Sequence, residues 1–437
     1  MAYRKRVGML GAVALAAAGL GLSASAVWAT EGYVQNGDGA RQKALAGAGV
    51  ADSTDATSIS LNPAGLVNAP DNELDTSMSF FAPYRYVEGA AGAGVVPDGR
   101  VDSKDNLFFI PNMAWSKKVN LPFADVVGFS VYGGGGNETK FPAVTPAGSY
   151  CQNSNPSGVF CTGTAGGSLQ QMLISLAVAK TIAPGVSVGI APILARQTLE
   201  IKGMGAFAYD SNHNAASIDT AHVSDQGTDV VWGGGARAGI EAQVAPHVRL
   251  GIAASTRIWS QKFDNYRGLL AGQGEADIPP ILQAGVAVDV SRDLTLMADY
   301  RRIWFSTVSA IGNPATNQAL LGSDNGPGFG YADVNALQLG AEYRAAPGLT
   351  LRGGYAYNNN PISSPNVMFD IIGPATVQQH LTAGAEMKVM KGMDFEIAGM
   401  YAPWNKVSGT ELSSTHGVTV GLEEFEVTAG IKYQLGQ

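Results

Sequence analysis

Charged residues are scarce in this sequence, and cysteine and histidine are scarcer still. Only 15% of the 437 residues are Asp, Glu, Lys or Arg, while 46% are hydrophobic, which is little charge for a soluble globular protein. Two cysteines exclude a disulfide-dense scaffold, and five scattered histidines without ligand spacing predict no metal site. The sequence has no phosphate-binding glycine loop, so we expect no cofactor. The net charge of −8 argues against nucleic acid as a partner.

The sequence also lacks long apolar runs, with one exception at the N-terminus. Three basic residues, Arg4 to Arg6, precede the apolar stretch Val7 to Leu22, which is shorter than the ~20 residues of a spanning helix. Val27-Trp28-Ala29, or alternatively Ala24-Ser25-Ala26, fits a cleavage site. We therefore expect residues 1–29 to be a cleaved signal peptide rather than an anchor helix, and the mature chain to be exported.

What the sequence does contain is strict alternation of apolar and polar residues from about residue 73 onward. Near the C-terminus one parity is apolar and the other carries charge and glycine: Phe425, Val427, Ala429, Ile431 and Tyr433 against Glu424, Glu426, Thr428, Gly430 and Lys432. A period of two indicates a strand with two unlike faces. A charge facing lipid near the bilayer midplane costs about 2–4 kcal/mol. The apolar parity is therefore expected to face lipid and the charged parity a wet lumen.

The connections between these segments alternate between short and long. Tight turns are expected near residues 122, 184, 246, 292, 347 and 391, and long polar loops at 87–105, 134–170, 203–228, 263–279, 308–332, 359–377 and 406–420. Six short turns and seven long loops separate fourteen strands. This pattern is typical of outer-membrane barrels, whose periplasmic turns are short and external loops long. The fold class predicted for residues 73–437 is all-β, a transmembrane antiparallel β-barrel of about 14 strands.

Residues 30–72 differ from the rest, because they are rich in small residues and show no sustained alternation. A barrel of fourteen strands is too wide for its own side chains to fill. We therefore expect this segment to form a hatch, or plug, inside the lumen.

The same segment carries a family resemblance. It runs Gly39-Ala40-Arg41-Gln42-Lys43-Ala44-Leu45-Ala46-Gly47-Ala48-Gly49-Val50-Ala51-Asp52 and reaches Asn62-Pro63-Ala64 just before the first strand. This resembles the N-terminal hatch of the FadL/TodX family of outer-membrane transporters, which carries an Asn-Pro-Ala motif. Phe109 to Trp115, Asp299 to Ser306 and Leu351 to Asn358 are similar to strands of that family. The resemblance covers essentially the whole mature chain.

The resemblance implies a hatch-plugged monomer in the outer membrane that transports hydrophobic small molecules passively and releases them sideways through the barrel wall. Long-chain fatty acids are the expected ligand, and aromatic or aliphatic hydrocarbons are the alternative. Outer-membrane lipid and lipopolysaccharide are the other expected partners. No enzymatic activity is expected.

Several residues are candidates for functional roles. Pro111 interrupts an otherwise regular strand and is the candidate for a lateral gate, with a proline of no consequence near the rim as the alternative. A fatty-acid carboxylate needs a buried cation or donors, and Arg257, Arg301 and Arg352 lie on the lumen parity. Ion pairing with lumen acids such as Glu241, Asp299, Glu342 and Glu386 is the alternative for these arginines.

The two cysteines, Cys151 and Cys161, lie in a loop-like stretch. In an exported protein such a pair predicts a disulfide on an external loop.

Two other classes of protein remain open. Gly185-Val186-Ser187-Val188-Gly189 matches the elbow of serine hydrolases, but it is expected to open a strand rather than to join a strand to a helix. An outer-membrane hydrolase would need His213 or His222 beside an acid at the barrel rim. A passive adhesin would account for the long loops but not for the plug.

Overall fold

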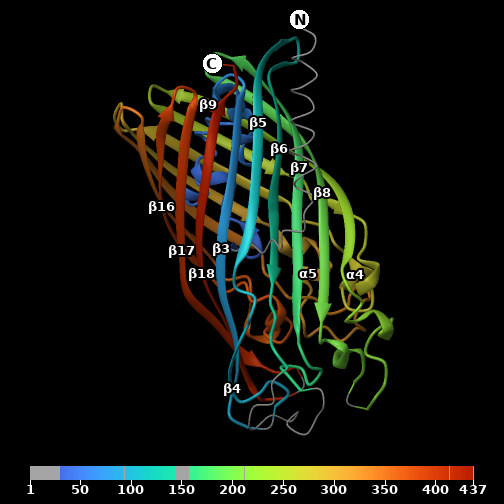
Figure 1. Ribbon diagram of the computed structural model, residues 1–437. Coiled ribbons are helices and arrows are strands. Elements are labelled where there is room, and N and C mark those ends of the chain that lie inside the picture. Colours follow the sequence, from blue (N-terminus) through green and yellow to red (C-terminus); the bar gives the residue numbers. More distant parts are fainter. Residues whose placement is uncertain (1–29, 93, 144–156, 211, 413, 437) are drawn as a thin grey trace, which may run out of the picture.

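Fourteen long strands form a closed antiparallel barrel (Figure 1) in the computed structural model, which describes residues 30–92, 94–143, 157–210, 212–412 and 414–436. Each strand pairs with the next, and β18 pairs with β3 along its length to close the ring. The strands are β3 (Glu73–Gly89), β5 (Phe108–Leu121), β6 (Ala124–Glu138), β7 (Gly166–Ala183), β8 (Val186–Lys202), β9 (Asp229–Ala245), β10 (Val248–Ser255), β12 (Ile281–Asp289), β13 (Leu294–Ile303), β14 (Val334–Ala346), β15 (Leu349–Asn358), β16 (Gln379–Met390), β17 (Met393–Thr410) and β18 (Gly417–Gln434). The predicted fold class is confirmed. The expected signal peptide lies outside the described residues.

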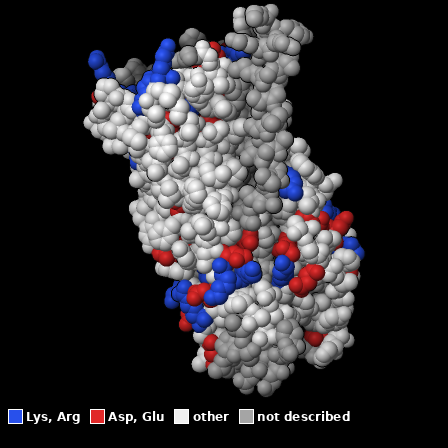
Figure 2. All heavy atoms as spheres, viewed as in Figure 1, with Lys and Arg blue, Asp and Glu red and all other residues white. Residues whose placement is uncertain are grey.

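The polarity of the wall is inverted relative to a soluble protein. On β18, Phe425 and Val427 are 42% and 49% exposed, whereas Glu424 and Lys432 are 1% and 7% exposed. Figure 2 shows few charged side chains across the middle of the strands on the visible face, with Lys, Arg, Asp and Glu gathered toward both ends. The apolar parity therefore faces outward and the charged parity faces the lumen, as the alternation predicted.

The connections follow the predicted order of lengths. Six short turns, such as that between β9 and β10, lie at the end of the barrel where β18 ends (Figure 1). The seven long connections lie at the other end and carry the short elements β4 (Gly99–Asp102), η3 (Gly205–Ala208), η4 (Thr220–His222), β11 (Trp259–Ser260), η5 (Asp264–Tyr266), α4 (Ala271–Gly274), η6 (Phe305–Thr307), α5 (Ser309–Gly312), η7 (Ser364–Asn366) and η8 (Phe369–Ile372). No described helix is long and apolar enough to cross a membrane.

The long connections are folded onto one another. Phe141 and Phe160 from the connection between β6 and β7, Tyr266 from that between β10 and β12, and Phe369 from that between β15 and β16 are buried in one apolar cluster. Burial of these side chains holds the loops as a compact cap over one end of the barrel.

The N-terminal segment lies within the ring of strands (Figure 1). Its elements are β1 (Thr30–Glu31), β2 (Val34–Gln35), α2 (Gly39–Ala44), α3 (Ser58–Leu61) and η1 (Pro63–Asn68). Helix α2 contacts β15 to β18, whereas η1 contacts β6 to β9 on another part of the wall. The segment therefore extends across the lumen from one side of the wall to another.

Candidate functional site

The Asn-Pro-Ala motif anchors the N-terminal segment to the wall. The Asn62 Oδ1 atom accepts from the backbone N–H of Ala64 at 3.1 Å and so caps η1, while Pro63 occupies the first turn, where its missing N–H costs no hydrogen bond. The Asn62 Nδ2 atom donates to the Val50 carbonyl at 2.7 Å and to the Ile240 carbonyl of β9 at 3.1 Å. One side chain thus joins a helix cap, the rest of the segment and the barrel wall.

The wall facing this motif is made of glycine where the backbones meet. A Cβ atom at Gly189 of β8 would lie 2.5 Å from the Ala64 nitrogen, and one at Gly239 of β9 would overlap the Asn62 side chain. A larger residue at either position would push the segment away from the wall. Part of the high glycine content is explained by this close approach.

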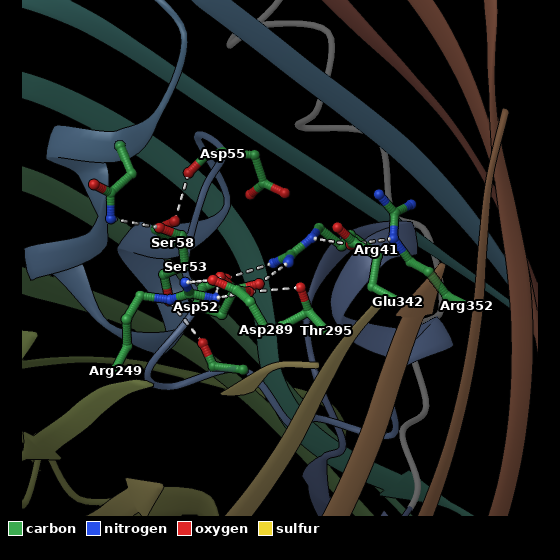
Figure 3. Close-up of polar contacts among 12 residues, drawn as sticks. Arg41, Asp52, Ser53, Asp55, Ser58, Arg249, Asp289, Thr295, Glu342 and Arg352 are labelled. Atoms are coloured by element: carbon green, nitrogen blue, oxygen red, sulfur yellow. Dashed lines mark hydrogen bonds and ion pairs between the residues drawn. The ribbon is translucent and has the colours of Figure 1, made fainter. Parts of the chain in front are cut away.

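Arg41 of α2 links the segment to the opposite wall (Figure 3). Its Nη2 atom donates to Asp52 Oδ2 at 2.9 Å, and its Nε atom donates to Glu342 Oε2 of β14 at 3.0 Å. Asp52 also accepts from Arg249 of β10 at 2.7 Å. Arg41 is only 4% exposed, so water does little to stabilise its charge, and the partner carboxylates must do so.

A second group of ion pairs extends this network. Lys432 of β18 lies 3.3 Å from Asp55 of the segment and 2.8 Å from Glu396. Burial acts to raise the pKa of Asp55, but the nearby Lys432 and Arg41 outweigh it, so the pKa is lowered below its usual range. Arg352 of β15 donates to three wall glutamates at 2.6–3.1 Å: Glu342, Glu386 and Glu396. Asp55 is therefore held as a carboxylate among lumen cations.

An apolar cavity of about 720 Å³ lies between the loops and the start of the N-terminal segment. Its apolar lining comes from β7, β8 and the long loops and includes Leu169, Leu199, Ile201, Leu270, Ile311 and Phe329. The polar lining includes Gln171 and Gln197, whose side chains are hydrogen-bonded to each other at 2.8 Å. None of the described residues that line the cavity is Lys, Arg or His. The cavity has the mostly apolar lining, with a few polar groups, of a small-molecule site.

Aromatic rings form a continuous series from the loops to this cavity. Phe207 contacts Phe160 with ring centroids 5.2 Å apart, and it contacts Phe369 at 5.5 Å. Phe329 continues the series to Tyr331 at 6.3 Å. The ring centroids of Tyr331 and Tyr33 are 6.5 Å apart, and Tyr33 is the residue that precedes β2. Edge-to-face and tilted pairs of this kind favour a further ring of the same type.

The three candidate arginines all have protein partners. Arg257 forms ion pairs with Asp277, at 2.5 Å, and with Glu275, the two acids that line the apolar cavity. Arg301 lies 3.2 Å from Glu31 and donates to the Gln35 carbonyl at 2.8 Å. Arg352 binds the three glutamates described above. Their role in binding a ligand carboxylate stays a prediction, and the geometry fits the alternative of ion pairing.

The wall is interrupted between β5 and β6. Pairing of these strands ends at Met113 and Val131, and within the described chain Phe108–Asn112 of β5 pairs only with β3. On the far side of the gap, β6 continues through Gly133 to Gly136 with a register shift against β7. Pro111 lies in the stretch of β5 that does not pair with β6. On its other side it pairs with Met78 of β3.

The N-terminal segment covers part of this interruption. Val34 pairs with Gly135, and the Gly136 N–H donates to the Tyr33 carbonyl at 2.9 Å. A Cβ atom at Gly135 would lie 2.5 Å from that carbonyl, so glycine is needed for β2 to reach β6. The first residues of the segment therefore provide the hydrogen-bond partner that β5 does not provide here.

Of the groups named for hydrolase chemistry, His222 does lie beside an acid, Asp219, but no serine joins them in the described structure. His222 contacts Asp219 at 2.9 Å and Arg267 at 3.1 Å, and within the described ranges no serine hydroxyl is hydrogen-bonded to His213 or His222. Ser187 faces the lumen at the start of β8, next to a short turn, whereas both histidines lie in the long connection that follows the other end of β8. In the part of the chain that the structure describes, no cluster of three His, Cys, Asp or Glu side chains could hold a metal ion.

The cysteine pair cannot be placed, because Cys151 lies outside the described residues. The disulfide between Cys151 and Cys161 stays a prediction.

Comparison with known proteins gives one family. The family described as outer membrane protein transport protein (OMPP1/FadL/TodX) matches residues 21–432. The chain belongs to this family. FadL/TodX proteins are outer-membrane transport barrels, so the six short turns lie on the periplasmic side and the long loops outside. The family is one of transporters, not of enzymes.

Solved FadL/TodX structures share the fold at low sequence identity. A Pseudomonas aeruginosa FadL homologue is 12% identical with a TM-score of 0.67, over 92% of this chain and 99% of its own. The Pseudomonas putida toluene transporter TodX is 14% identical with a TM-score of 0.63, over 92% and 99%. The Ralstonia pickettii toluene transporter TbuX is 17% identical with a TM-score of 0.62, over 91% and 98%. No curated protein matches the sequence.

Two features of this FadL/TodX barrel were missed by the sequence analysis. The loop expected at 134–170 includes three of the four consecutive glycines, Gly133 to Gly136. Such a run in a strand indicates a bend or a close approach of another backbone. The aromatic series joins rings from separate segments, from Tyr33 near the N-terminal end of the described chain to Phe369 in the connection between β15 and β16. No local spacing could have predicted that series.

Arg41 offers a test of the network. Replacing Arg41 with Met leaves Asp52 and Glu342 with fewer cationic partners in a buried place, and breaking a buried pair in this way costs about 3–5 kcal/mol. We expect the free energy of unfolding in lipid vesicles, measured by urea titration, to fall by about that amount. The matched change Arg100→Met breaks the exposed pair with Asp102, and it should cost less than about 1 kcal/mol. Equal costs for the two variants would contradict the network's importance.

Proposed function

We propose that this protein is a passive outer-membrane channel for neutral hydrophobic small molecules, and that monoaromatic hydrocarbons are its best ligands. The observation that carries the proposal is the apolar cavity, whose described lining contains aromatic and aliphatic side chains but no cation. An unpaired carboxylate in such a place would be costly. A hydrocarbon needs no charged partner.

The charges beside the cavity support a neutral ligand. Glu275 and Asp277 line it, and both are bound by Arg257. A fatty-acid carboxylate that formed an ion pair with Arg257 would displace Glu275 or Asp277 and leave that acid without a cationic partner. Arg301 and Arg352 are engaged deeper in the lumen with Glu31 and the wall glutamates. The fatty-acid expectation therefore has weaker support than its hydrocarbon alternative.

The aromatic series supports the choice within hydrocarbons. Seven rings lie in contact from the outer loops to the cavity, the six described above and Phe305, which contacts both Tyr331 and Tyr33. Favourable ring contacts contribute about 0.5–1.5 kcal/mol beyond burial alone. Among proteins of the same fold, TodX and TbuX are toluene transporters and CymD is a monoaromatic hydrocarbon channel.

The proposed route has a hatch and a side exit. Residues 30–72 obstruct the lumen as the hatch, anchored by Asn62-Pro63-Ala64, and residues 73–437 form the wall. Ligand leaves the cavity near Tyr33 and passes through the interruption between β5 and β6 into the bilayer. Burial of each methylene is favourable by about 0.8 kcal/mol, so a lateral exit avoids returning the ligand to water. The protein acts as a monomer surrounded by outer-membrane lipid and lipopolysaccharide.

Deletion of residues 30–66 tests the hatch. Removing the segment opens the lumen of a wide barrel, so ion conductance in planar bilayers should rise by about an order of magnitude or more. Heat-modifiable migration on gels, which reports a folded barrel, is the control. A folded deletion variant with the conductance of the intact protein would show that the segment does not close the lumen.

Pro111→Val tests the exit. Valine restores the N–H that proline lacks and favours strand pairing, so β5 can extend its ladder along β6. We expect uptake of toluene by proteoliposomes to fall several-fold. The matched control is Pro192→Val, a proline of β8 that is separated from β6 by β7 and lies opposite Ala236 of β9. Normal uptake by a folded Pro111 variant would mean that this proline has no role in the exit.

Phe329→Ala tests the ligand class. The lost ring contacts should lower toluene binding roughly tenfold, while Phe123→Ala, at an exposed periplasmic turn, should leave it unchanged. Binding is measured by calorimetry on the purified protein, alongside hexadecanoate and hexadecane. A preference for hexadecanoate over both hydrocarbons would overturn the proposal and restore the fatty-acid reading.

A further inference from the structure

A second chamber of about 750 Å³ lies on the other side of β2, deeper in the lumen than the apolar cavity. Val34 and Gln35 line it on one side, and Tyr132, Gly133 and Gly134 of β6 line it on the other. It therefore adjoins the interruption between β5 and β6. A ligand that leaves by the route proposed above passes this chamber.

Arg237 of β9 lines the chamber and differs from the other buried arginines of the network. It is 9% exposed. Its Nε atom donates to Ser255 Oγ and its Nη1 atom to the Tyr132 hydroxyl, both at the long distance of 3.3 Å. Among the described residues it forms no ion pair, whereas Arg41, Arg249 and Arg352 each bind two or more carboxylates. A buried guanidinium with only long neutral contacts is poorly compensated.

Two further polar atoms of the chamber's lining residues have no partner in the described structure. Arg301 Nε–H, a donor, and Gln35 Oε1, an acceptor, are both buried and make no hydrogen bond. A buried polar atom without a partner costs about 1–3 kcal/mol. Arg237 and Arg301 together therefore present donors to whatever occupies this space.

One part of the remaining wall of the chamber is apolar. Tyr132, Leu173, Ile193 and Ile258 form one buried cluster there. A ring or a short chain could pack against this cluster while its polar end meets Arg237. The chamber thus differs from the apolar cavity, which has no described cation.

The acids that face the chamber weaken rather than cancel this charge. Asp38 lines it and lies near Lys43, Arg237 and Arg301, and burial raises the pKa of Asp38 to about 6. Glu31 is already bound to Arg301, and Lys43 is bound to Glu426. At neutral pH Asp38 is therefore mostly ionised, but among the described residues it forms no ion pair with Arg237, which is the cation of the chamber with the least compensation.

We propose that this chamber is a second ligand site, which takes the carboxylate of a small aromatic acid on Arg237 and packs its ring against the Tyr132 cluster. The inference rests on the proposed function for its route to the membrane exit. It extends the ligands of the protein from neutral hydrocarbons to their carboxylated relatives, with the two classes held in different chambers.

Calorimetry with benzoate, acetate and toluene on the purified intact protein tests the assignment. Arg237→Gln should weaken benzoate binding at least tenfold and leave toluene binding unchanged, and Arg237→Lys should retain an intermediate affinity. Asp38→Asn keeps the oxygen that accepts from Gln35 but removes a negative charge, so benzoate binding at pH 7.5 should become several-fold tighter. Arg100→Gln, on the exposed surface, is the matched control.

The outcomes separate this site from the proposed function. Benzoate binding that is absent in the wild type, or unaffected by Arg237→Gln, overturns the second site while toluene binding stands. Acetate binding as tight as that of benzoate overturns the assignment to an aromatic acid, because the ring would then contribute nothing. Loss of toluene binding in the wild type overturns the proposed function, and Arg237-dependent benzoate binding would still support the site.

Discussion

A strand wall in lipid must satisfy its backbone hydrogen bonds within the protein, because no water is present to replace a missing partner. β18 meets this requirement by pairing with β3 over its whole length. The single departure described above, between β5 and β6, occurs where β6 obtains a partner from the N-terminal segment instead. The N-terminal segment inside the barrel and the gap in the wall are thus parts of one arrangement, and movement of β2 would affect both.

The same lipid boundary determines where charge can be placed. Charged side chains excluded from the outer face gather in the lumen, where Arg352 meets three glutamates and Lys432 meets Asp55. These groups compensate one another around the N-terminal segment. The apolar cavity lies above this layer, beneath a cap of packed loops. A hydrophobic ligand therefore has an apolar place to bind although most of the lumen is strongly polar.

The sequence predicted the barrel well because alternation is a local property with a single physical cause. The parity of Glu424, Phe425 and their neighbours determines which face meets lipid, and the turn residues determine where each strand ends. The partners of the lumen arginines could not be predicted in this way. Arg257 pairs with acids of a loop, and Arg237, which has the same parity, does not form an ion pair among the described residues. Such differences depend on how loops and hatch fill the lumen, which no periodicity encodes.

The ion pairs of the hatch also bear on the order of assembly. Asp55 and Lys43 bind Lys432 and Glu426, which belong to the last strand of the barrel. Contacts between residues so far apart in the chain form late, because a long loop must be closed first. The earliest part of the mature chain therefore obtains its final partners only when the last strand is in place. Closure of the barrel and the final placement of the N-terminal segment are therefore coupled, because both depend on β18.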